Sequence, residues 1–367
     1  MNQALSFTVN HADPGSRART GLLQTFHGAI HTPAFIPVGT LGTIKSLTPD
    51  ELREAGVEII LCNTYHLFLR PGRDVIVSMG GLHRFINWPS PILTDSGGFQ
   101  TYSLQKLVKS YDDGVSIASP LDGTRHFLSP EGVIEIQQDL GSDILMPLDD
   151  CPPFPATRKR VERAVHLTNM WVMRSKASFT RKNQALFCIV QGGMFHDLRR
   201  RSASELAEIS FDGYALGGFS VGEPSDLREE AIHETASCLP EDKPRYLMGM
   251  GTPADILKAV MEGIDLFDCV LPTRAARNGL LFTSSGKISL KRSIYAKDPS
   301  PPDRSCSCYT CSNYSLAYLR HLFLSKEILA SRLNTIHNVW YYMTIMKTIR
   351  TAIQNNKLQE LQRCIPV

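Results

Sequence analysis

Short apolar runs alternate with stretches of helical periodicity from about residue 40 onward. Each run ends in glycine or polar residues, and a segment with apolar positions three or four apart follows it. The runs cover residues 57–61, 91–94, 144–148, 186–190, 214–216, 245–248 and 266–271. Near-continuous apolar strands that alternate with helices are typical of a parallel sheet covered by helices. The pattern therefore predicts an α/β protein.

Helix signals separate these strands. Thr48-Pro49 and Ser129-Pro130 place a capping residue before a proline, which suits the first turn of a helix. Helices are expected over residues 48–54, 129–141, 157–177, 196–209, 226–239 and 253–263. Six or seven strand–helix units in succession favour a (β/α)8 TIM-type barrel over a doubly wound sheet, which is the alternative.

Polar residues and glycines stand at or near the ends of the predicted strands. They are Asp95, Asp149, Gln191, Gly218 and Asp268. In a TIM-type barrel, the carboxyl ends of all strands meet at one mouth. We therefore expect these residues, which are far apart in the sequence, to line a single pocket.

The stretch from residue 263 to residue 279 contains the highest concentration of candidate catalytic and binding side chains. Asp268 lies in an apolar strand that we expect to end at Pro272, and a loop with Arg274 and Arg277 should follow. Because of the two cations, Asp268 is expected to stay ionised and to act on an anionic substrate. An ordinary Asp–Arg ion pair at a strand end is the alternative.

Composition and charge restrict the possible partners and compartment of the protein but do not indicate its function. A net charge of +3 over 367 residues permits a local basic surface but does not demonstrate a nucleic-acid partner. The N-terminus lacks the apolar core of a signal peptide, and no run approaches the length of a membrane span. Six of the nine cysteines are scattered singly, which argues for a reducing compartment. We expect a cytoplasmic protein with no membrane partner.

The proline-rich segment 297–305 indicates a change of organisation. We expect a catalytic barrel over residues 1–293, with its final helix contributed by the C-terminal region. A zinc-binding subdomain and C-terminal helices are expected over residues 294–367.

Three cysteines predict a metal site in that second region. Cys306, Cys308 and Cys311 supply three soft ligands within six residues, a density that selects Zn²⁺. His321 and His337 are the candidates for a fourth ligand, and we favour His337 because it should open the last helix. Four protein ligands would make the zinc structural. Three buried thiols without a metal are the alternative.

Two carboxylates at one barrel mouth suit glycosyl transfer. Asp268 would be the nucleophile, and Asp95 lies in a glycine-rich turn where a ligand can approach the backbone. A helix cap or turn former is the alternative for Asp95. Asp149 and Gln191 match the donors and acceptors of a purine-like edge, and Gly218 would add a backbone N–H. A carbohydrate glycosidase also fits the two acids, but it leaves the cysteine cluster unexplained.

Several sequence motifs together resemble one known family, the bacterial tRNA-guanine transglycosylases. The resemblance runs from about residue 20 to the last helix. The motifs are TPAFIPVGT, CNTYHLFLRPG, ILTDSGGFQ, SPLDGTRHFLSPE, LDDCPPFPAT, IVQGG, GYALGGFSVGE, MGMGTP, LFDCVLPTRAARNG and the CSCYTC cluster with a later HN.

The resemblance implies a zinc-containing TIM barrel that acts on the anticodon stem-loop of tRNA. Such enzymes exchange guanine at the wobble position of the tRNAs for Asn, Asp, His and Tyr. The incoming base is 7-aminomethyl-7-deazaguanine, a 7-deazaguanine precursor of queuosine, and the reaction passes through a covalent Asp–ribose intermediate. The resemblance also implies a homodimer.

The family's functional positions map onto this sequence one by one. Asp268 matches the nucleophile and Asp95 the proton acceptor. The positions that match the base pocket are Asp95, Ser96, Gly97, Gly98, Phe99, Asp149, Gln191, Gly218, Phe219 and Met248. The positions that match RNA-binding loops are Gly249, Met250, Gly251, Thr252, Pro253, Ala254, Asp255, Thr273, Arg274, Ala275, Ala276 and Arg277. Cys306, Cys308, Cys311 and His337 match the zinc ligands.

Two positions bear on the choice of base, since Cys151 and Val221 are expected in bacterial members of the family. A version that inserts the bulkier queuine and a non-catalytic RNA-binding subunit are the alternatives. The sequence departs from the family pattern at Phe99, at Phe219-Ser220 and at Ala275.

Overall fold

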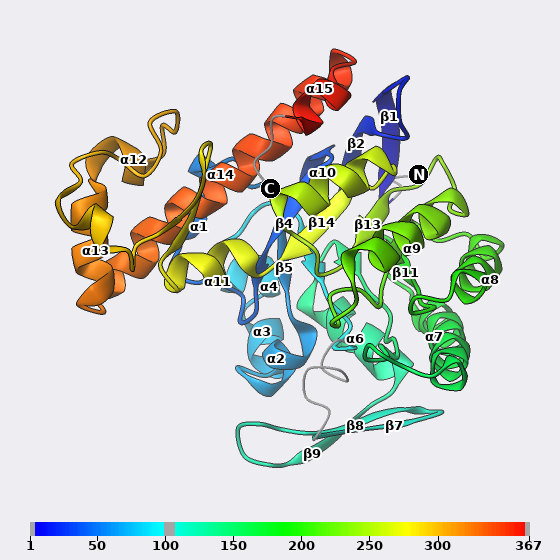
Figure 1. Cartoon of the computed structure of the whole chain (residues 1–367). Coiled ribbons are helices and arrows are strands. Elements are labelled where there is room, and N and C mark those ends of the chain that lie inside the picture. The colour runs from blue at the N-terminus through cyan, green and yellow to red at the C-terminus, as the bar shows by residue number, and fades with distance from the viewer. Residues whose placement is uncertain (1–3, 99–106, 364–367) are drawn as a thin grey trace.

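A closed barrel of eight parallel strands forms the centre of the protein (Figure 1). The computed structural model describes residues 4–98 and 107–363. In order around the barrel, the strands are β10 (Ile144–Leu145), β11 (Ala185–Val190), β12 (Gly213–Leu216), β13 (Arg245–Leu247), β14 (Leu266–Cys269), β4 (Ala34–Gly39), β5 (Ile60–Cys62) and β6 (Ile92–Thr94). The predicted TIM-type α/β class is confirmed.

Helices surround the barrel and bury its outer face. They are α1 (Pro49–Glu54), α2 (Thr64–Leu69), α3 (Arg73–Ser78), α4 (Leu82–Phe85), α6 (Pro130–Leu140), α7 (Arg158–Ser178), α8 (His196–Ala207), α9 (Ser225–Ser237), α10 (Pro253–Met261), α11 (Leu271–Arg277) and α14 (Ile328–Gln354). The predicted caps are confirmed: Thr48 accepts from the Glu51 N–H, and Ser129 from the Gly132 N–H. All six residues of β11 are buried, as expected of a strand with packed faces on both sides.

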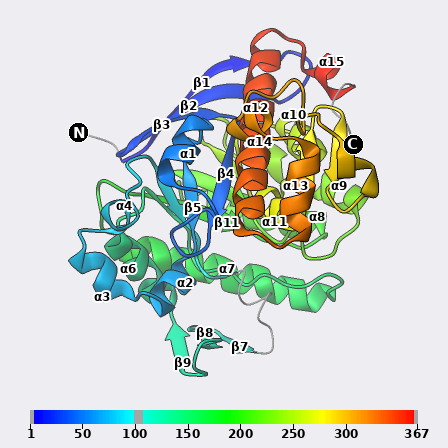
Figure 2. The ribbon, with the colours of Figure 1, turned by 90° about the vertical axis from the view of Figure 1, so that its left-hand side faces the viewer.

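The sequence pattern missed four sets of strands, one of which is the hairpin of residues 280–283 and 286–289. The first barrel strand, β4, precedes the start of the recognised repeat. An antiparallel sheet of β1 (Ser6–Ala12), β2 (Arg19–Thr25) and β3 (Gly28–Thr32) comes before it. A second antiparallel sheet of β7 (Val108–Tyr111), β8 (Gly114–Ala118) and β9 (Arg125–Leu128) extends away from the barrel (Figures 1 and 2).

The loop expected after Asp268 is a helix, so that prediction was wrong. Pro272 lies in the first turn of α11, where its missing N–H and fixed φ are favourable. Proline therefore starts a helix here instead of only ending a strand. The two arginines lie in the last turn of α11, near the negative end of its dipole.

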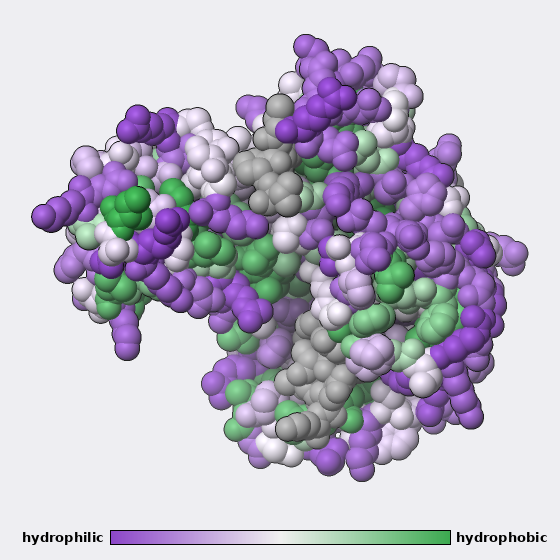
Figure 3. Space-filling view, viewed as in Figure 1, coloured by the Kyte–Doolittle hydropathy of each residue, from purple (hydrophilic) through white to green (hydrophobic). Residues whose placement is uncertain are grey.

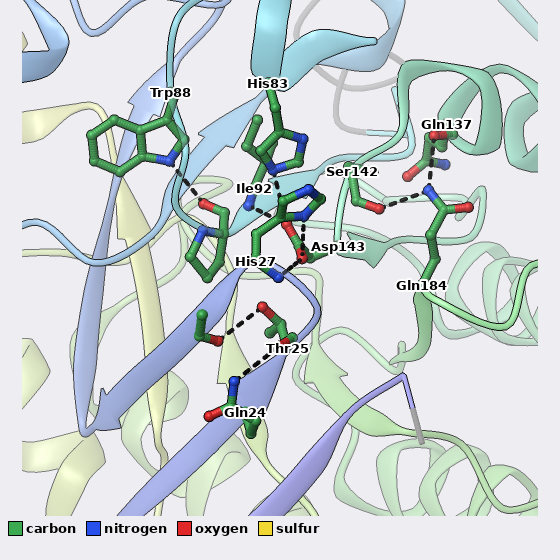
Figure 4. A network of polar contacts seen from close by, with 12 residues as sticks. Gln24, Thr25, His27, His83, Trp88, Ile92, Gln137, Ser142, Asp143 and Gln184 are labelled. Carbon is green, nitrogen blue, oxygen red and sulfur yellow. Dashed lines mark hydrogen bonds and ion pairs between the residues drawn. The ribbon is translucent and has the colours of Figure 1, made fainter. Parts of the chain in front are cut away.

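Asp143 joins segments of the barrel and the N-terminal sheet (Figure 4). Its Oδ1 accepts from the backbone N–H of His27 at 3.1 Å and lies 2.9 Å from His27 Nδ1. Its Oδ2 accepts from the N–H of Ile92 at 2.9 Å and lies 3.1 Å from His83 Nε2. These contacts together hold the pKa of the buried Asp143 carboxyl well below its usual range, although burial itself raises it. The cluster thus fixes where β6 and β10 begin.

The same three side chains lie close enough together to be considered as a metal site. The imidazole rings of His27 and His83, however, stack with centroids 3.6 Å apart and planes at 22°. Nitrogen lone pairs lie in the ring plane, so nearly parallel rings cannot direct both onto one ion. We therefore interpret the cluster as a charge-assisted hydrogen-bond network.

A lobe follows the barrel strands and contains β15 (Leu280–Thr283), β16 (Gly286–Ser289), the 3₁₀-helix η2 (Ser293–Lys297), α12 (Tyr309–Asn313) and α13 (Leu316–Leu324). Helix α14 connects this lobe to the barrel, because it contacts α12 and α13 at one end and β1, β2 and β4 further along (Figure 1). The short helix α15 (Leu358–Gln362) ends the described chain. Within residues 4–98 and 107–363, no helix is long and apolar enough to cross a membrane.

Candidate active site and metal centre

A pocket of about 310 Å³ lies at the carboxyl ends of the barrel strands. It brings together residues from β4, β5, β13 and β14 and from the loops that follow the strands. Among the predicted site residues, those that line it are Asp95, Asp149, Gly218, Phe219, Met248, Gly249 and Asp268. Cys151 also lines it, and Ser96, Gly97, Gly98 and Gln191 are buried immediately around it. Phe99 lies outside the described residues.

Asp268 belongs to β14 and is held through one of its two oxygens. Its Oδ1 accepts from Tyr246 Oη at 2.6 Å and from the Gly249 N–H at 2.8 Å. Burial raises the pKa of Asp268, and these two hydrogen bonds lower it. Both hydrogen bonds that the described residues make to this carboxylate fall on Oδ1. Oδ2 is therefore left for a ligand.

The expected influence of the arginines on Asp268 is not observed. Neither Arg274 nor Arg277 forms an ion pair with Asp268 among the described residues, and the pKa of Asp268 is raised rather than lowered. Burial and the nearby Arg274 also lower the pKa of Arg277, so the two cations lie near each other. The reason is the helical geometry of α11, which places both side chains beyond the strand end. An ordinary Asp–Arg ion pair, the alternative from the sequence, is likewise absent from this part of the structure.

Asp95 follows β6 and is bound on both oxygens. The Thr64 N–H donates to Oδ1 at 2.8 Å, and Asn63 Nδ2 donates to Oδ2. Burial raises the pKa of Asp95 to about 6, and the charge of Asp268 acts in the same direction. A carboxyl group with such a pKa can accept a proton near neutral pH and release it again.

Asp149 lines the pocket, and Gln191 contacts Asp149. Gln191 Nε2 donates to Asp149 Oδ2 at 2.8 Å, and Ser96 Oγ donates to Oδ1 at 3.3 Å. Burial raises the pKa of Asp149 to about 6. A Cβ on Gly98 would lie 1.8 Å from Asp149 Oδ1, so only glycine permits this approach. Gln191 Oε1 is buried and has no hydrogen-bond partner among the described residues, which suits a site completed by a ligand.

The loop after β12 forms another wall of the pocket. Gly218 adopts φ +76°, and a Cβ there would lie 2.5 Å from Gln191 Oε1. Glu223 stabilises the same loop, because its two oxygens accept from the N–H groups of Ser220 at 2.8 Å and Val221 at 2.9 Å. The loop is therefore preorganised with its backbone close to the pocket.

The two predicted RNA-binding segments differ in what they expose. In α11, Thr273, Ala275 and Ala276 are buried, while the Arg274 side chain is exposed and Arg277 is half-buried. In the other segment, Met250 is buried and Tyr342 Oη donates to the Gly251 carbonyl at 2.6 Å. Thr252 caps α10, so Pro253, Ala254 and Asp255 form its first turn and do not lie in a loop.

The cysteine cluster and one histidine converge in the lobe. His337 Nδ1 lies 3.8, 3.7 and 3.2 Å from the sulfurs of Cys306, Cys308 and Cys311, respectively. A tetrahedral zinc with Zn–S of about 2.3 Å and Zn–N of about 2.0 Å places such atoms about 3.5 Å apart. His337 Nε2 lies 2.7 Å from the Phe282 carbonyl, a contact that orients Nδ1 toward the sulfurs. The donor set fits Zn²⁺.

The sequence analysis expected His337 to open the last helix. In the structure, His337 lies well inside α14, which begins at Ile328. The apolar residues before His337 pack against the lobe and extend the helix backwards. The next residue, Asn338, donates through Nδ2 to the Pro272 carbonyl at 3.0 Å. Helix α14 therefore joins the cysteine cluster directly to α11.

Sequence reasoning assigned no role to several residues that shape the pocket. Asn63 and Thr64 hold Asp95, His66 lines the pocket, and Tyr246 holds Asp268. The polar residues after the strand that ends at Cys62 were a usable signal, because they occupy a strand end. Tyr246 gave no such signal, since it lies within an apolar strand and only the barrel turns it toward Asp268.

This arrangement places a carboxylate with a free oxygen and a proton-accepting carboxyl group in one pocket. A third carboxylate and backbone groups can read a planar polar ligand. Together they suit the displacement of a base from a sugar.

Comparison with known proteins agrees with this chemistry. Residues 13–365 match the family model described as queuine tRNA-ribosyltransferase. A protein of that name from Caldanaerobacter subterraneus subsp. tengcongensis is 54% identical over 360 residues, which cover 98% of this chain and 96% of that protein. The namesake from Thermodesulfovibrio yellowstonii is 55% identical over 348 residues, covering 94% of this chain and 91% of that protein. The chain thus belongs to the queuine tRNA-ribosyltransferase family, the tRNA-guanine transglycosylases.

Proposed function

We propose that this enzyme replaces guanine by 7-aminomethyl-7-deazaguanine at the wobble position of the tRNAs for Asn, Asp, His and Tyr. The observation that carries the proposal is that Asp95 and Asp268 line one pocket while Oδ2 of Asp268 remains uncommitted. Family membership and the sequence motifs support the choice of substrates. The enzyme acts in queuosine biosynthesis in this proposal.

Asp268 is the nucleophile of the proposed double displacement. Its Oδ2 attacks C1′ of the ribose while the bond from C1′ to N9 breaks with its electron pair on N9, and the departing guanine takes up a proton at N9 from solvent. Tyr246 and the Gly249 N–H hold Oδ1 and so orient the other oxygen. They also oppose the effect of burial on the pKa of Asp268, which favours the ionised form needed for attack.

Asp95 is the proton acceptor for the incoming base. It removes the proton from N9, the nitrogen attacks C1′, and the bond between C1′ and Asp268 breaks. Asp149, Gln191 and the Gly218 N–H read the edge of the base. Met248 covers the base, and the carbonyl of residue 219 accepts from the aminomethyl group.

The choice between the two bases rests on Cys151, which lines the pocket, and on Val221, which is buried and follows the pocket-lining Ser220. Their side chains limit the space for a larger 7-substituent, so we favour the aminomethyl base over queuine. Competition between the two bases for incorporation into tRNA tests this choice, and preferential uptake of queuine would reverse it. The non-catalytic alternative is disfavoured because both acids are present.

The RNA would lie over α11. Arg274 and Arg277 carry two cations in the last turn of α11, the helix that begins after the pocket-lining Val270, and backbone phosphates can bind such cations. The target base must leave its stack to reach buried acids, and an anticodon loop makes this extraction less costly than a duplex.

We further propose a structural zinc ion held by Cys306, Cys308, Cys311 and His337, one per chain. The ion would supply four bonds that hold the lobe on α14 and no chemistry at the pocket.

A homodimer is also part of the proposal, with the protein acting in the cytoplasm. Apolar and aromatic side chains are exposed on the lobe and at the start of α14, among them Tyr309, Tyr318, Leu324 and Ile328, the last 84% exposed. Figure 3 shows apolar patches on this lobe. Sedimentation at micromolar concentration measures the assembly, and a monomer at all concentrations would contradict it.

Replacing Asp268 by Asn should abolish base exchange and preserve tRNA binding. Asn keeps the size of the side chain but cannot form the covalent bond, so we expect exchange of labelled guanine to fall by at least about 10⁴-fold. Filter binding should give an unchanged tRNA affinity. Asp50→Asn, at an exposed position on α1, is the matched control. Exchange that persists in Asp268→Asn would remove Asp268 from its role.

The pH profile should show two acids at work. The pKa values of Asp95 and Asp149 are both raised to about 6, so both carboxyls are protonated and inactive well below that pH. We expect kcat/KM to rise with pH and level off above about 7, with a slope of two in log units on the acid side. In Asp149→Asn the slope should fall to one. A flat profile between pH 5 and 7 would contradict these roles.

Replacing Cys308 by Ser should remove the zinc. We expect about one zinc per wild-type chain by atomic absorption, and a loss of metal with cooperative destabilisation of the lobe in the variant. Cys238→Ser, at a half-buried cysteine on the C-terminal end of α9, serves as the control. A fully stable wild-type protein without metal would argue against the zinc proposal.

A further inference from the structure

Arg199 is a buried cation close to the base pocket. It lies on α8 and is 0% exposed, although arginine is almost never fully buried unless it is paired. No salt bridge to Arg199 exists among the described residues, and it does not line the pocket itself. Such a residue carries a desolvation cost that specific contacts must offset.

The contacts of Arg199 reach two loops at once. Its Nε donates to the Gly193 carbonyl at 2.6 Å, and its Nη2 donates to the Gly217 carbonyl at 3.1 Å. Its guanidinium carbon lies 4.0 Å from the centroid of the Phe219 ring. The first carbonyl belongs to the loop after β11 that carries Gln191, and the other contacts belong to the loop after β12. One side chain therefore connects the two loops assigned to base recognition.

The loops are closely packed around this side chain. A Cβ on Gly192 would lie 2.5 Å from Arg199 Cγ and 2.7 Å from its backbone nitrogen. A Cβ on Gly218 would lie 3.5 Å from Arg199 Nη2. The distance at Gly218 is an ordinary van der Waals contact, whereas at position 192 only glycine allows the backbone to close around α8.

The charge of Arg199 is balanced by dipoles more than by a counter-ion. Burial lowers the pKa of Arg199 to about 9, and the charge of Glu223 acts in the opposite direction. Arg199 is still a cation at neutral pH. Glu223 is itself occupied by the N–H groups of Ser220 and Val221. Arg199 and Glu223 therefore hold opposite ends of the same loop, one by a carbonyl and the other by two amides.

We propose that Arg199 is a positioning residue that sets the relative placement of the two base-recognition loops. Through Gly193 it fixes the loop that carries Gln191, and through Gly217 and Phe219 it fixes the N–H of Gly218 and the carbonyl of residue 219. The inference rests on the proposed function and deepens it, since it names what determines affinity for the base. Lysine cannot replace the planar fork that reaches two carbonyls.

Phe219 gives the proposal a second, independent contact. A leucine at this position would offer no aromatic face to the guanidinium. Phe219 is 4% exposed and lies between Arg199 and the pocket, so its ring transmits the position of Arg199 to the carbonyl that faces the base.

Arg199→Lys in the full-length enzyme tests the inference by separating two Michaelis constants. We expect KM for 7-aminomethyl-7-deazaguanine to rise about tenfold, as loss of a charged hydrogen bond implies, with KM for tRNA within twofold of wild type. Arg200→Lys is the matched control. Arg200 follows Arg199 on α8, but its side chain is exposed and pairs with Glu234 on the surface. Unchanged constants, or an equal rise in both, would overturn the positioning role.

A second variant covers the case in which Arg199→Lys does not fold. Phe219→Leu keeps the backbone and removes the ring, and we expect KM for the base alone to rise two- to fivefold. An unchanged KM for the base in Phe219→Leu would overturn the inference. Failure of the proposed function is distinguishable: a wild-type enzyme that exchanges guanine but rejects the deazaguanine refutes the base assignment, and the effect of Arg199 is then measured on KM for guanine.

Discussion

Three carboxylates share one buried pocket without a cation paired to any of them in the described part of the chain. Burial raises the pKa of Asp95, Asp149 and Asp268 alike, so the protein must hold them with hydrogen bonds instead. Each receives a different set of donors, from Asn63 and Thr64, from Gln191 and Ser96, and from Tyr246 and Gly249. Those donors determine which acid exchanges protons and which keeps an oxygen free.

Two groups of contacts outside the pocket hold the elements that surround it. On one side, Arg199 and Glu223 hold the loops that follow β11 and β12 from within. On the other, α14 carries His337 in the cysteine cluster and, one residue later, Asn338 against the start of α11. The lobe is thus connected by a single rigid helix to the arginines beside the pocket.

Much of the framework was predictable because local rules are consistent there. Caps at Thr48 and Ser129, apolar strands and polar strand ends gave the barrel and the convergence of distant acids on one mouth. The misses have physical causes. A proline such as Pro272 is compatible both with the end of a strand and with the first turn of a helix. Which of the two forms depends on the packing of the residues around it. The start of α14 was placed too late because only Ala330 and Leu333 in its first turns are buried against the lobe, a tertiary contact that a periodicity analysis does not foresee.

The sequence by itself determined the alternation of strands and helices, the set of acids and the three cysteines of the candidate metal site. These depend on residue type and spacing, which the chain displays directly. Only the tertiary structure decided which partners each acid has, that Arg274 and Arg277 form no ion pair with Asp268 in the described chain, and that Arg199 lies buried against two loops. Such features depend on which residues barrel closure brings within hydrogen-bond distance, and sequence separation carries no information about that.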